Sequence, residues 1–142
     1  MSWWSDIFSG GDESTHSVDY YAEGVQLLRS GHYHEAVTSF RLALRENPTD
    51  SAVLQQIAIA YTRIGMTEEA ARTYRTVLQH DARASGAHYG LAFLLLREGN
   101  AEEATSHLRS FLEFAPRTPE ASRHIEHART TLRELAGRPE RE

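Results

Sequence analysis

Apolar residues recur every three or four positions through most of the chain, the spacing that gathers side chains on one face of an α-helix. The first stretch holds Tyr20, Gly24 and Leu27 and ends before Gly31, and the second begins near Ala36 and stops at Asn47-Pro48. Four more stretches follow, with apolar positions at Leu54, Ile57, Ala58 and Tyr61, at Ala70, Tyr74, Val77 and Leu78, at Leu91, Ala92 and Leu95, and at Ala104, Leu108, Phe111 and Leu112. The pattern predicts six amphipathic helices that form three hairpins.

The three predicted hairpins are copies of one unit. Glycines recur every 34 residues at Gly31, Gly65 and Gly99, and alanines recur at the same spacing at Ala36, Ala70 and Ala104. Glycine permits the left-handed conformation that ends a helix, and small residues allow two helices to approach closely. A period of this length indicates stacked copies that share one continuous core, with repeats at 17–50, 51–84 and 85–118.

Capping residues mark where several helices should begin. Thr67 and Asn100 each precede acidic residues and are expected to cap the second helices of repeats two and three. Thr118-Pro119 is a start signal for a seventh helix, which Gly137 should end. The apolar residues of this helix form one narrow stripe, consisting of Ala121, Ile125, Ala128, Leu132 and Leu135. Residues 119–136 are therefore predicted to cap the last hairpin and to face water on the other side.

The repeated columns resemble the tetratricopeptide repeat, in which small and aromatic residues, a glycine, an alanine and an exit proline stand at fixed places. Residues 17–118 hold three copies in register, although Ala82 replaces proline, Phe111 replaces alanine and His88 replaces a large apolar residue. The resemblance implies an all-α fold, a right-handed superhelix of three antiparallel hairpins with a capping helix, about seven helices in all. A repeat domain at 17–136 would then lie between an arm, 1–16, and a disordered tail, 137–142.

Each first helix carries a second stripe, offset by one residue or about 100° from its core-facing stripe. In the tetratricopeptide family this stripe lines the concave surface, so the resemblance implies a groove with aromatic walls at both ends. Such a groove suits an amphipathic or extended apolar peptide. Alternatively, Val25 and Ile59 only complete the packing between repeats. The stripe consists of Tyr21, Val25 and Leu28 in the first repeat, Gln55 and Ile59 in the second, and Tyr89, Phe93 and Leu96 in the third.

Arg29, Arg63 and Arg97 stand beside this stripe, two residues before each glycine. As a ladder of guanidinium groups they could hold carboxylates of a partner. The alternative is that each cation only stabilises the negative end of a helix dipole. Members of the family that bind chaperone tails hold a terminal carboxylate with lysine, arginine and asparagine on the inner helices. Here those places are mostly apolar and the chain has no lysine, so we do not expect a clamp of that kind.

The N-terminal segment lies outside the period and contains both tryptophans of the chain. Trp3, Trp4, Ile7 and Phe8 are costly to leave in water, at up to about 1.5–3 kcal/mol each. A glycine-rich, polar stretch separates them from the first repeat and predicts a flexible arm. We expect these side chains to dock on the first hairpin, in the groove of the same or a second copy, or on a membrane surface, unless the arm stays disordered.

Composition and charge exclude several classes of function. The chain has 142 residues, no cysteine and a net charge of −5 that is spread along it, with no basic face for nucleic acid. No apolar run is long enough to span a membrane, and no secretory signal is recognisable. His124 and His127, with Glu120 one turn earlier, have a spacing that can hold a metal, but no third helix supplies a matched ligand. The sequence gives no cofactor, metal site or catalytic residue that we can identify.

These observations favour a cytoplasmic, non-enzymatic module that binds a protein partner, as a peptide or helix, in its concave groove. Two alternatives remain at the level of the sequence. One is a scaffold that self-associates weakly through the arm, and the other is a chaperone-like holder of apolar client segments. The resemblance extends to the three-repeat chaperones of bacterial secretion systems, which bind apolar segments of their clients. The least supported interpretation, beside these two alternatives, is an enzyme or metalloprotein that uses His124 and His127.

Overall fold

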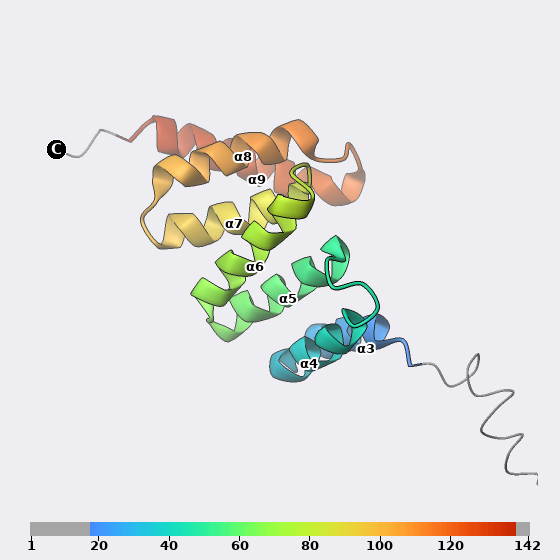
Figure 1. Cartoon of the computed structure of the whole chain (residues 1–142). Coiled ribbons are helices and arrows are strands. Elements are labelled where there is room, and N and C mark those ends of the chain that lie inside the picture. Colours follow the sequence, from blue (N-terminus) through green and yellow to red (C-terminus); the bar gives the residue numbers. More distant parts are fainter. Residues whose placement is uncertain (1–17, 139–142) are drawn as a thin grey trace, which may run out of the picture.

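The computed structural model describes residues 18–138, which form seven α-helices and contain no strand (Figure 1). The predicted arm and most of the predicted tail lie outside this range. Within it, no helix is both long enough and apolar enough to cross a membrane. The helices are α3 (Tyr20–Arg29), α4 (Tyr33–Ala43), α5 (Ser51–Ile64), α6 (Thr67–His80), α7 (Ser85–Arg97), α8 (Ala101–Phe114) and α9 (Pro119–Ala136).

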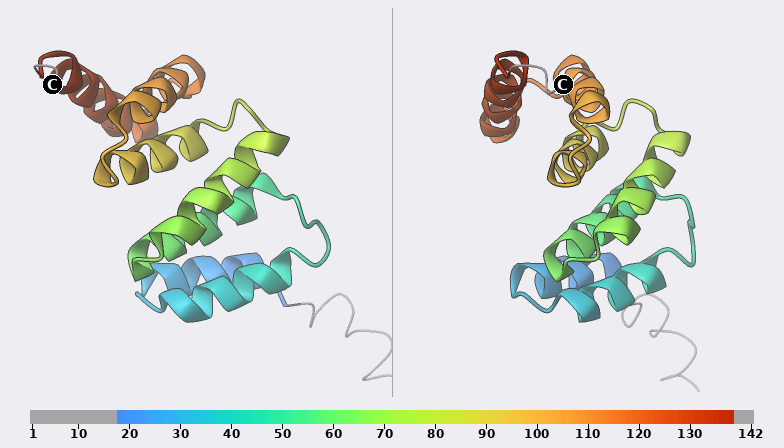
Figure 2. Two further views of the ribbon diagram at one scale, coloured as in Figure 1. Left: turned by 60° about the vertical axis from the view of Figure 1, so that its left-hand side comes forward. Right: turned by 90° about the vertical axis from the view of Figure 1, so that its left-hand side faces the viewer.

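Successive helices pack as antiparallel hairpins, α3 with α4, α5 with α6 and α7 with α8, which stack in chain order (Figure 2). The first helices also touch one another across repeats, α3 with α5 and α5 with α7. The second helices instead contact the helices immediately before and after them in the chain. Since the first helices lie closer together, the stack curves with α3, α5 and α7 on its inner side. The fold is the helical solenoid that the period predicts.

The turns within the hairpins follow the predicted chemistry. Gly31, Gly65 and Gly99 have φ angles of 84°, 95° and 84°, and no other described residue has a positive φ. The amide groups that follow these helices reach back to carbonyl groups of the last turn, as from Met66 to Tyr61 at 2.9 Å. A side chain at these positions would be strained in the left-handed region, which explains why glycine recurs there.

Two of the predicted caps are confirmed and one is wrong. Asn100 accepts a hydrogen bond from the Glu103 amide at 3.2 Å, and Thr118 accepts one from the Ala121 amide at 3.3 Å. Thr67, in contrast, is the first residue of α6; Met66 occupies the cap position and gives no side-chain hydrogen bond. The Thr67 hydroxyl is of the kind that caps helices, but the turn after Gly65 is short, so the helix begins at Thr67 itself and not after it.

Other helix ends differ slightly from expectation. The helix α4 ends at Ala43, before Asn47-Pro48, because residues 44–46 form a turn that leads to the next repeat. Gly137 follows α9 as predicted, but its φ of −83° is not left-handed. Glycine and proline signals locate the end of a helix only to within one or two residues, because several neighbouring residues can end it.

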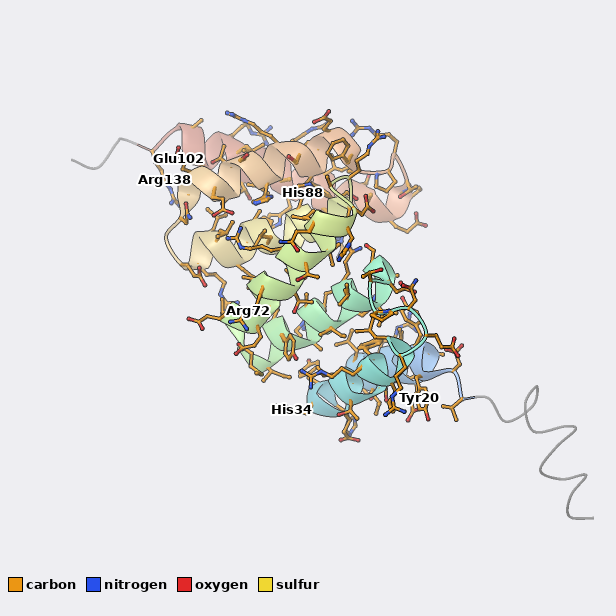
Figure 3. All side chains as sticks on the ribbon, viewed as in Figure 1. Tyr20, His34, Arg72, His88, Glu102 and Arg138 are labelled. Atoms are coloured by element: carbon orange, nitrogen blue, oxygen red, sulfur yellow. The ribbon has the colours of Figure 1, made fainter. Side chains whose placement is uncertain are left out.

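The core forms two clusters of buried side chains. The larger runs from the first hairpin into the third and includes Phe40 and Leu91, both with no exposed surface. The smaller joins α7 and α8 to α9 through Leu108, Phe111 and Ile125. The helix α9 thus covers the last hairpin, as its narrow apolar stripe predicts, at the opposite end of the stack from Tyr20 (Figure 3).

The two helices of the first hairpin approach each other closely at Gly24. A Cβ atom at this position would lie 2.5 Å from Cε1 of the buried Phe40 ring. We expect Gly24→Ala to lower the free energy of unfolding by about 1 kcal/mol, because overpacking costs about 1–3 kcal/mol. The higher helix propensity of alanine returns at most about 1 kcal/mol. Urea denaturation followed by circular dichroism measures the difference.

Gly86→Ala is the matched control for this prediction. Its added Cβ would meet only the side-chain oxygen at the end of Gln55, which can rotate away. The gain in helix propensity should then leave the protein unchanged or stabilise it by up to about 1 kcal/mol. Equal effects at the two glycines would contradict the packing assigned to Phe40.

Candidate partner-binding pocket

A pocket of about 460 Å³ opens on the inner side of the stack, between repeats two and three and the capping helix. We call it the inner pocket. It draws residues from α5, α6, α7, α8 and α9, so it exists only when the last two hairpins and the cap are assembled. Its lining consists of Ile59, Thr62, Arg63, Tyr74, Gly86, Tyr89, Gly90, Phe93, Leu94, Arg97, Phe111 and His124.

Aromatic rings form one wall of the inner pocket. Tyr89 lies at the centre of this wall, with its ring centroid 4.8 Å from that of Phe93 and 4.9 Å from that of Phe111. Both pairs are tilted, at 55° and 57°, which is a favourable arrangement for aromatic contacts. Phe111 is buried in the smaller core cluster and holds Tyr89 from behind.

Two histidines of α9, His124 and His127, pack against the rings of Tyr89 and Phe93. The His127 ring stacks on Phe93 at 4.6 Å with an interplanar angle of 5°, and its Nδ1 lies 2.7 Å from the Tyr89 hydroxyl oxygen. The His124 ring meets Tyr89 edge-on at 4.9 Å. Burial raises the pKa of the Tyr89 phenol, so the hydroxyl stays neutral and available for this hydrogen bond. The wall is therefore fixed before any partner arrives, which lowers the entropic cost of binding.

Two glycines of α7 allow neighbouring side chains to approach this helix closely beside the aromatic wall. At Gly90 a Cβ would lie 2.3 Å from Cζ of Tyr74, so the helix α7 approaches the floor of the pocket closely. Tyr74 is buried, and this burial raises its pKa to about 12 against the opposing effect of its hydrogen bond with Thr62. Gly86 lies one turn before Gly90 on α7, and a Cβ there would lie 2.5 Å from the side-chain oxygen of Gln55, so a second side chain also packs closely on this helix.

The charges around the inner pocket are all basic. Arg63 and Arg97 line it and are exposed, and the lining contains no aspartate or glutamate. Neither arginine forms an ion pair with another residue in the range 18–138. A guanidinium group can hold a carboxylate through two parallel hydrogen bonds, so both side chains are available to an acidic ligand.

The structure places only some of the eleven residues predicted for the groove around the inner pocket. Ile59, Arg63, Tyr89, Phe93 and Arg97 come together around the inner pocket. Gln55 borders Gly86, and its amide nitrogen donates to the Ser51 hydroxyl at 3.1 Å. Arg29 is exposed on the first helix, outside the pocket. The remaining four, which are half-buried, pack against the larger core cluster; they are Tyr21, Val25, Leu28 and Leu96.

Several lining residues escape the sequence argument. In the sequence Phe111 is an apolar position of a predicted helix and a departure from alanine, and neither signal shows that it supports Tyr89. The pair Gly86 and Gly90 had a signal, two glycines one turn apart within a helix, where glycine is otherwise unfavourable. His124 belongs to the cap, and only the packing angle of α9 brings it to the pocket. Among residues 18–138, no group of three histidine, aspartate or glutamate side chains is placed to hold a metal ion.

A second cluster of polar side chains lies between α6, α7 and α8, away from the inner pocket. The buried His88 donates from Nε2 to the Ala82 carbonyl at 2.8 Å, and its Nδ1 lies 2.9 Å from Nδ1 of His107. His107 Nε2 lies 3.3 Å from Glu103, which Arg75 binds at 2.6 Å. His88 is labelled in Figure 3. The histidine that replaces a large apolar residue thus links α7 to α8 and to the turn between α6 and α7 through hydrogen bonds.

This cluster predicts that the protein loses stability in acid. Burial lowers the pKa of the His107 imidazole, an effect that its hydrogen bond to Glu103 opposes only in part. The unfolded chain therefore binds a proton at His107 at higher pH than the folded chain. The free energy of unfolding should fall as the pH drops below about 6.5. Arg75 holds the pKa of Glu103 below its usual range, so a further loss is expected below about pH 4.3.

Urea unfolding midpoints between about pH 7.5 and about pH 5.5 measure the first of these losses. His107→Gln should flatten the dependence in this interval because it removes the titrating group. His34→Gln, at an exposed position on α4, should leave the dependence unchanged. A stability that rises on acidification, or an identical slope in the His107 variant, would contradict the assignment.

Comparison with known proteins supports the repeat architecture. A family model described as tetratricopeptide repeat matches residues 27–82 and 65–124. The comparison with curated protein sequences gives no match. Among solved structures, the Yersinia enterocolitica type III secretion chaperone SycD, in complex with a peptide of the translocator YopD, superposes with a TM-score of 0.77. It is 20% identical, over 87% of this chain and 97% of that chain.

Two further structures are similar. PcrH in complex with the chaperone binding region of PopD has a TM-score of 0.74 at 19% identity, over 82% of this chain and 88% of that chain; PcrH comes from Pseudomonas aeruginosa. The first TPR of Spaghetti (RPAP3), bound to the HSP90 peptide SRMEEVD, has a TM-score of 0.67 at 18% identity, over 80% and 90%. At these identities the likeness establishes the fold.

Proposed function

Because the chain belongs to the tetratricopeptide repeat family, we propose that it is a non-enzymatic interaction module that binds a peptide or partner helix in the inner pocket. The ligand that fits has a large apolar side chain with a carboxylate group close to it in the sequence. The observation that carries this proposal is the combination of a fixed aromatic wall, a lining without acidic residues, and two arginines that form no ion pair with any residue of 18–138.

The aromatic wall supplies most of the expected binding energy. Tyrosine and phenylalanine bury a large area with few rotatable bonds, and such residues dominate the energetics of many interfaces. Tyr89 and Phe93 are held by His127 and Phe111, so an incoming apolar side chain meets a surface that does not have to reorganise. The two arginines, Arg63 and Arg97, then select for acidic neighbours of that side chain.

The structural neighbours are consistent with this proposal. SycD was solved with a peptide of the translocator YopD, and PcrH with the chaperone binding region of PopD. The RPAP3 repeat domain was solved with a short peptide that contains two glutamates and an aspartate. By analogy of fold, we propose that this chain also holds a short segment of another protein. Transient holding of an apolar client segment would use the same pocket and the same residues.

Selection from a random peptide library displayed on phage tests the proposal. We expect the wild-type chain to enrich peptides that contain a large apolar residue with aspartate or glutamate within a few positions. The double variant Arg63→Glu/Arg97→Glu should lose the acidic preference. Arg29→Glu serves as the matched control, because Arg29 has the same place in the first repeat but lies outside the pocket, and it should retain the preference. Enrichment that is identical for all three proteins would refute the assignment of the pocket.

A further inference from the structure

We propose that the inner pocket has an occupant within the same chain, the N-terminal segment Trp3–Phe8, which competes with the partner peptide. The inference rests on the pocket described for the proposed function, although not on the identity of any partner. The segment lies outside the described residues, and we infer its docking site from chemistry, reach and charge.

The chemistry of the segment matches that of the pocket. Within six residues it places Trp3, Trp4, Ile7 and Phe8 around a single carboxylate, Asp6. A large apolar side chain beside a carboxylate is the ligand that the aromatic wall and the two arginines fit. Burial of one indole or phenyl group contributes about 1.5–3 kcal/mol to docking, and this gain offsets the entropic cost of ordering a short segment.

The chain between the segment and the first helix is long enough to reach the pocket. Nine residues lie between Phe8 and Val18, where the described structure begins, and the ten steps from one to the other span about 33–36 Å when the chain is extended. The helix α3 contacts α5, and α5 contacts α7. At about 8–10 Å between the axes of packed helices, the distance across the inner surface from α3 to α7 is about 20 Å. The segment can therefore occupy the inner pocket without any change in the solenoid.

A second hollow competes for the segment, at the N-terminal end of the stack beside Tyr20. Its volume is about 850 Å³, and it is the nearer site because Val18 itself lines it. However, its charged lining residues are Asp19, Glu46, Asp50 and one arginine, Arg45. Residues 1–16 contain Asp6, Asp12 and Glu13 and no basic residue other than His16. Like charges therefore disfavour docking of the acidic N-terminal segment in this acidic hollow, whereas the basic inner pocket attracts the segment.

Docking within one chain is favoured over docking between two copies. A short tether gives the segment an effective concentration in the millimolar range at its own pocket. A second copy in a micromolar solution supplies the segment at a concentration about a thousandfold lower. Docking of the segment therefore lowers the apparent affinity for the partner. The apparent affinity is the affinity of the free pocket multiplied by the fraction of molecules whose pocket is free.

Tryptophan fluorescence tests the docking directly, because both tryptophans of the chain are in the segment. We expect the full chain to show blue-shifted emission and weaker acrylamide quenching than a synthetic peptide of residues 1–17. Arg63→Glu/Arg97→Glu should shift the emission toward that of the free peptide. Arg29→Glu should leave it unchanged, as should Ala52→Arg, which blocks the hollow at the N-terminal end.

Three results would overturn the proposal. The first is wild-type emission and quenching equal to those of the free peptide. The second is release of the tryptophans by Ala52→Arg and not by the arginine reversal, which would place the segment in the other hollow. The third is a red shift on dilution from about 50 µM to about 0.5 µM, which would show docking between copies in this concentration range. Circular dichroism confirms that each variant is folded.

A binding measurement separates this proposal from the proposed function. The chain without residues 1–17 retains every described helix, and we expect it to bind a phage-selected peptide about tenfold more tightly than the full chain does. If the truncated chain binds no selected peptide while the tryptophans of the full chain are protected, only the proposed function fails. If both chains bind with equal affinity and the tryptophans are free, only the docking of the segment fails.

Discussion

Phe111→Ala is expected to lower the free energy of unfolding by about 3–5 kcal/mol, the range for buried phenylalanines replaced by alanine. Phe111 is 4% exposed and lies in the cluster that joins α8 to α9. Its removal leaves a cavity beneath Tyr89, whose ring centroid is 4.9 Å away. Because domains of this size are stable by only about 5–15 kcal/mol, the loss is a large part of the total.

The substitution restores the residue that the tetratricopeptide pattern has at this place, so a family-based argument predicts little effect. The structure predicts a large one, since α9 and Tyr89 are packed around the phenyl ring. Phe114→Ala is the control on the same helix. Phe114 is half-buried, with the guanidinium carbon of Arg83 5.3 Å from its ring centroid, and we expect a loss of about 1 kcal/mol. Urea unfolding curves that give equal losses for the two variants would contradict the role of Phe111.

Phe93→Ala is expected to weaken the binding of a selected peptide by about 30-fold or more, which corresponds to about 2 kcal/mol or more. Phe93 lines the inner pocket and is stacked on His127, so its loss removes contact area and loosens the wall around Tyr89. Fluorescence anisotropy with a labelled peptide measures the affinity. Circular dichroism shows that the variant is folded under the same conditions.

Leu96→Ala is the informative control because sequence periodicity places Leu96 and Phe93 in the same groove stripe. In the structure Leu96 packs against the larger core cluster and does not line the pocket. Its truncation should lower the stability of the protein and leave the affinity of the folded protein unchanged. If Leu96→Ala weakens binding as much as Phe93→Ala does, the binding surface is the whole predicted stripe and not the inner pocket.

The fold was predictable from the sequence because its determinants are local and repeated three times. Gly31, Gly65 and Gly99 each fix a turn through a positive φ, and alanines such as Ala36 and Ala70 fix the close contact within a hairpin. Agreement among three copies reinforces each of these local signals. Helix ends such as that of α4 at Ala43 were less predictable, because a turn of several residues there has no single determinant.

The inner pocket was predictable only in part. Periodicity identified the face of α7 that carries Tyr89 and Phe93, since that argument needs only one helix. It could not show that Tyr21 and Leu28 pack against the core, because this depends on how the hairpins rotate against each other. Nor could it bring His124 and His127 to the aromatic rings, since the angle at which α9 crosses the last hairpin is set by three-dimensional packing.

The most direct test of the account is to locate a bound peptide by nuclear magnetic resonance, with a phage-selected peptide added to the isotope-labelled chain. We predict intermolecular contacts from an apolar side chain of the peptide to the rings of Tyr89 and Phe93. Shift changes at the side-chain nitrogens of Arg63 and Arg97 should saturate together with those contacts. Contacts confined to the outer helices α4, α6 and α8, with these four residues unperturbed, would contradict the central claim that the inner pocket is the binding site.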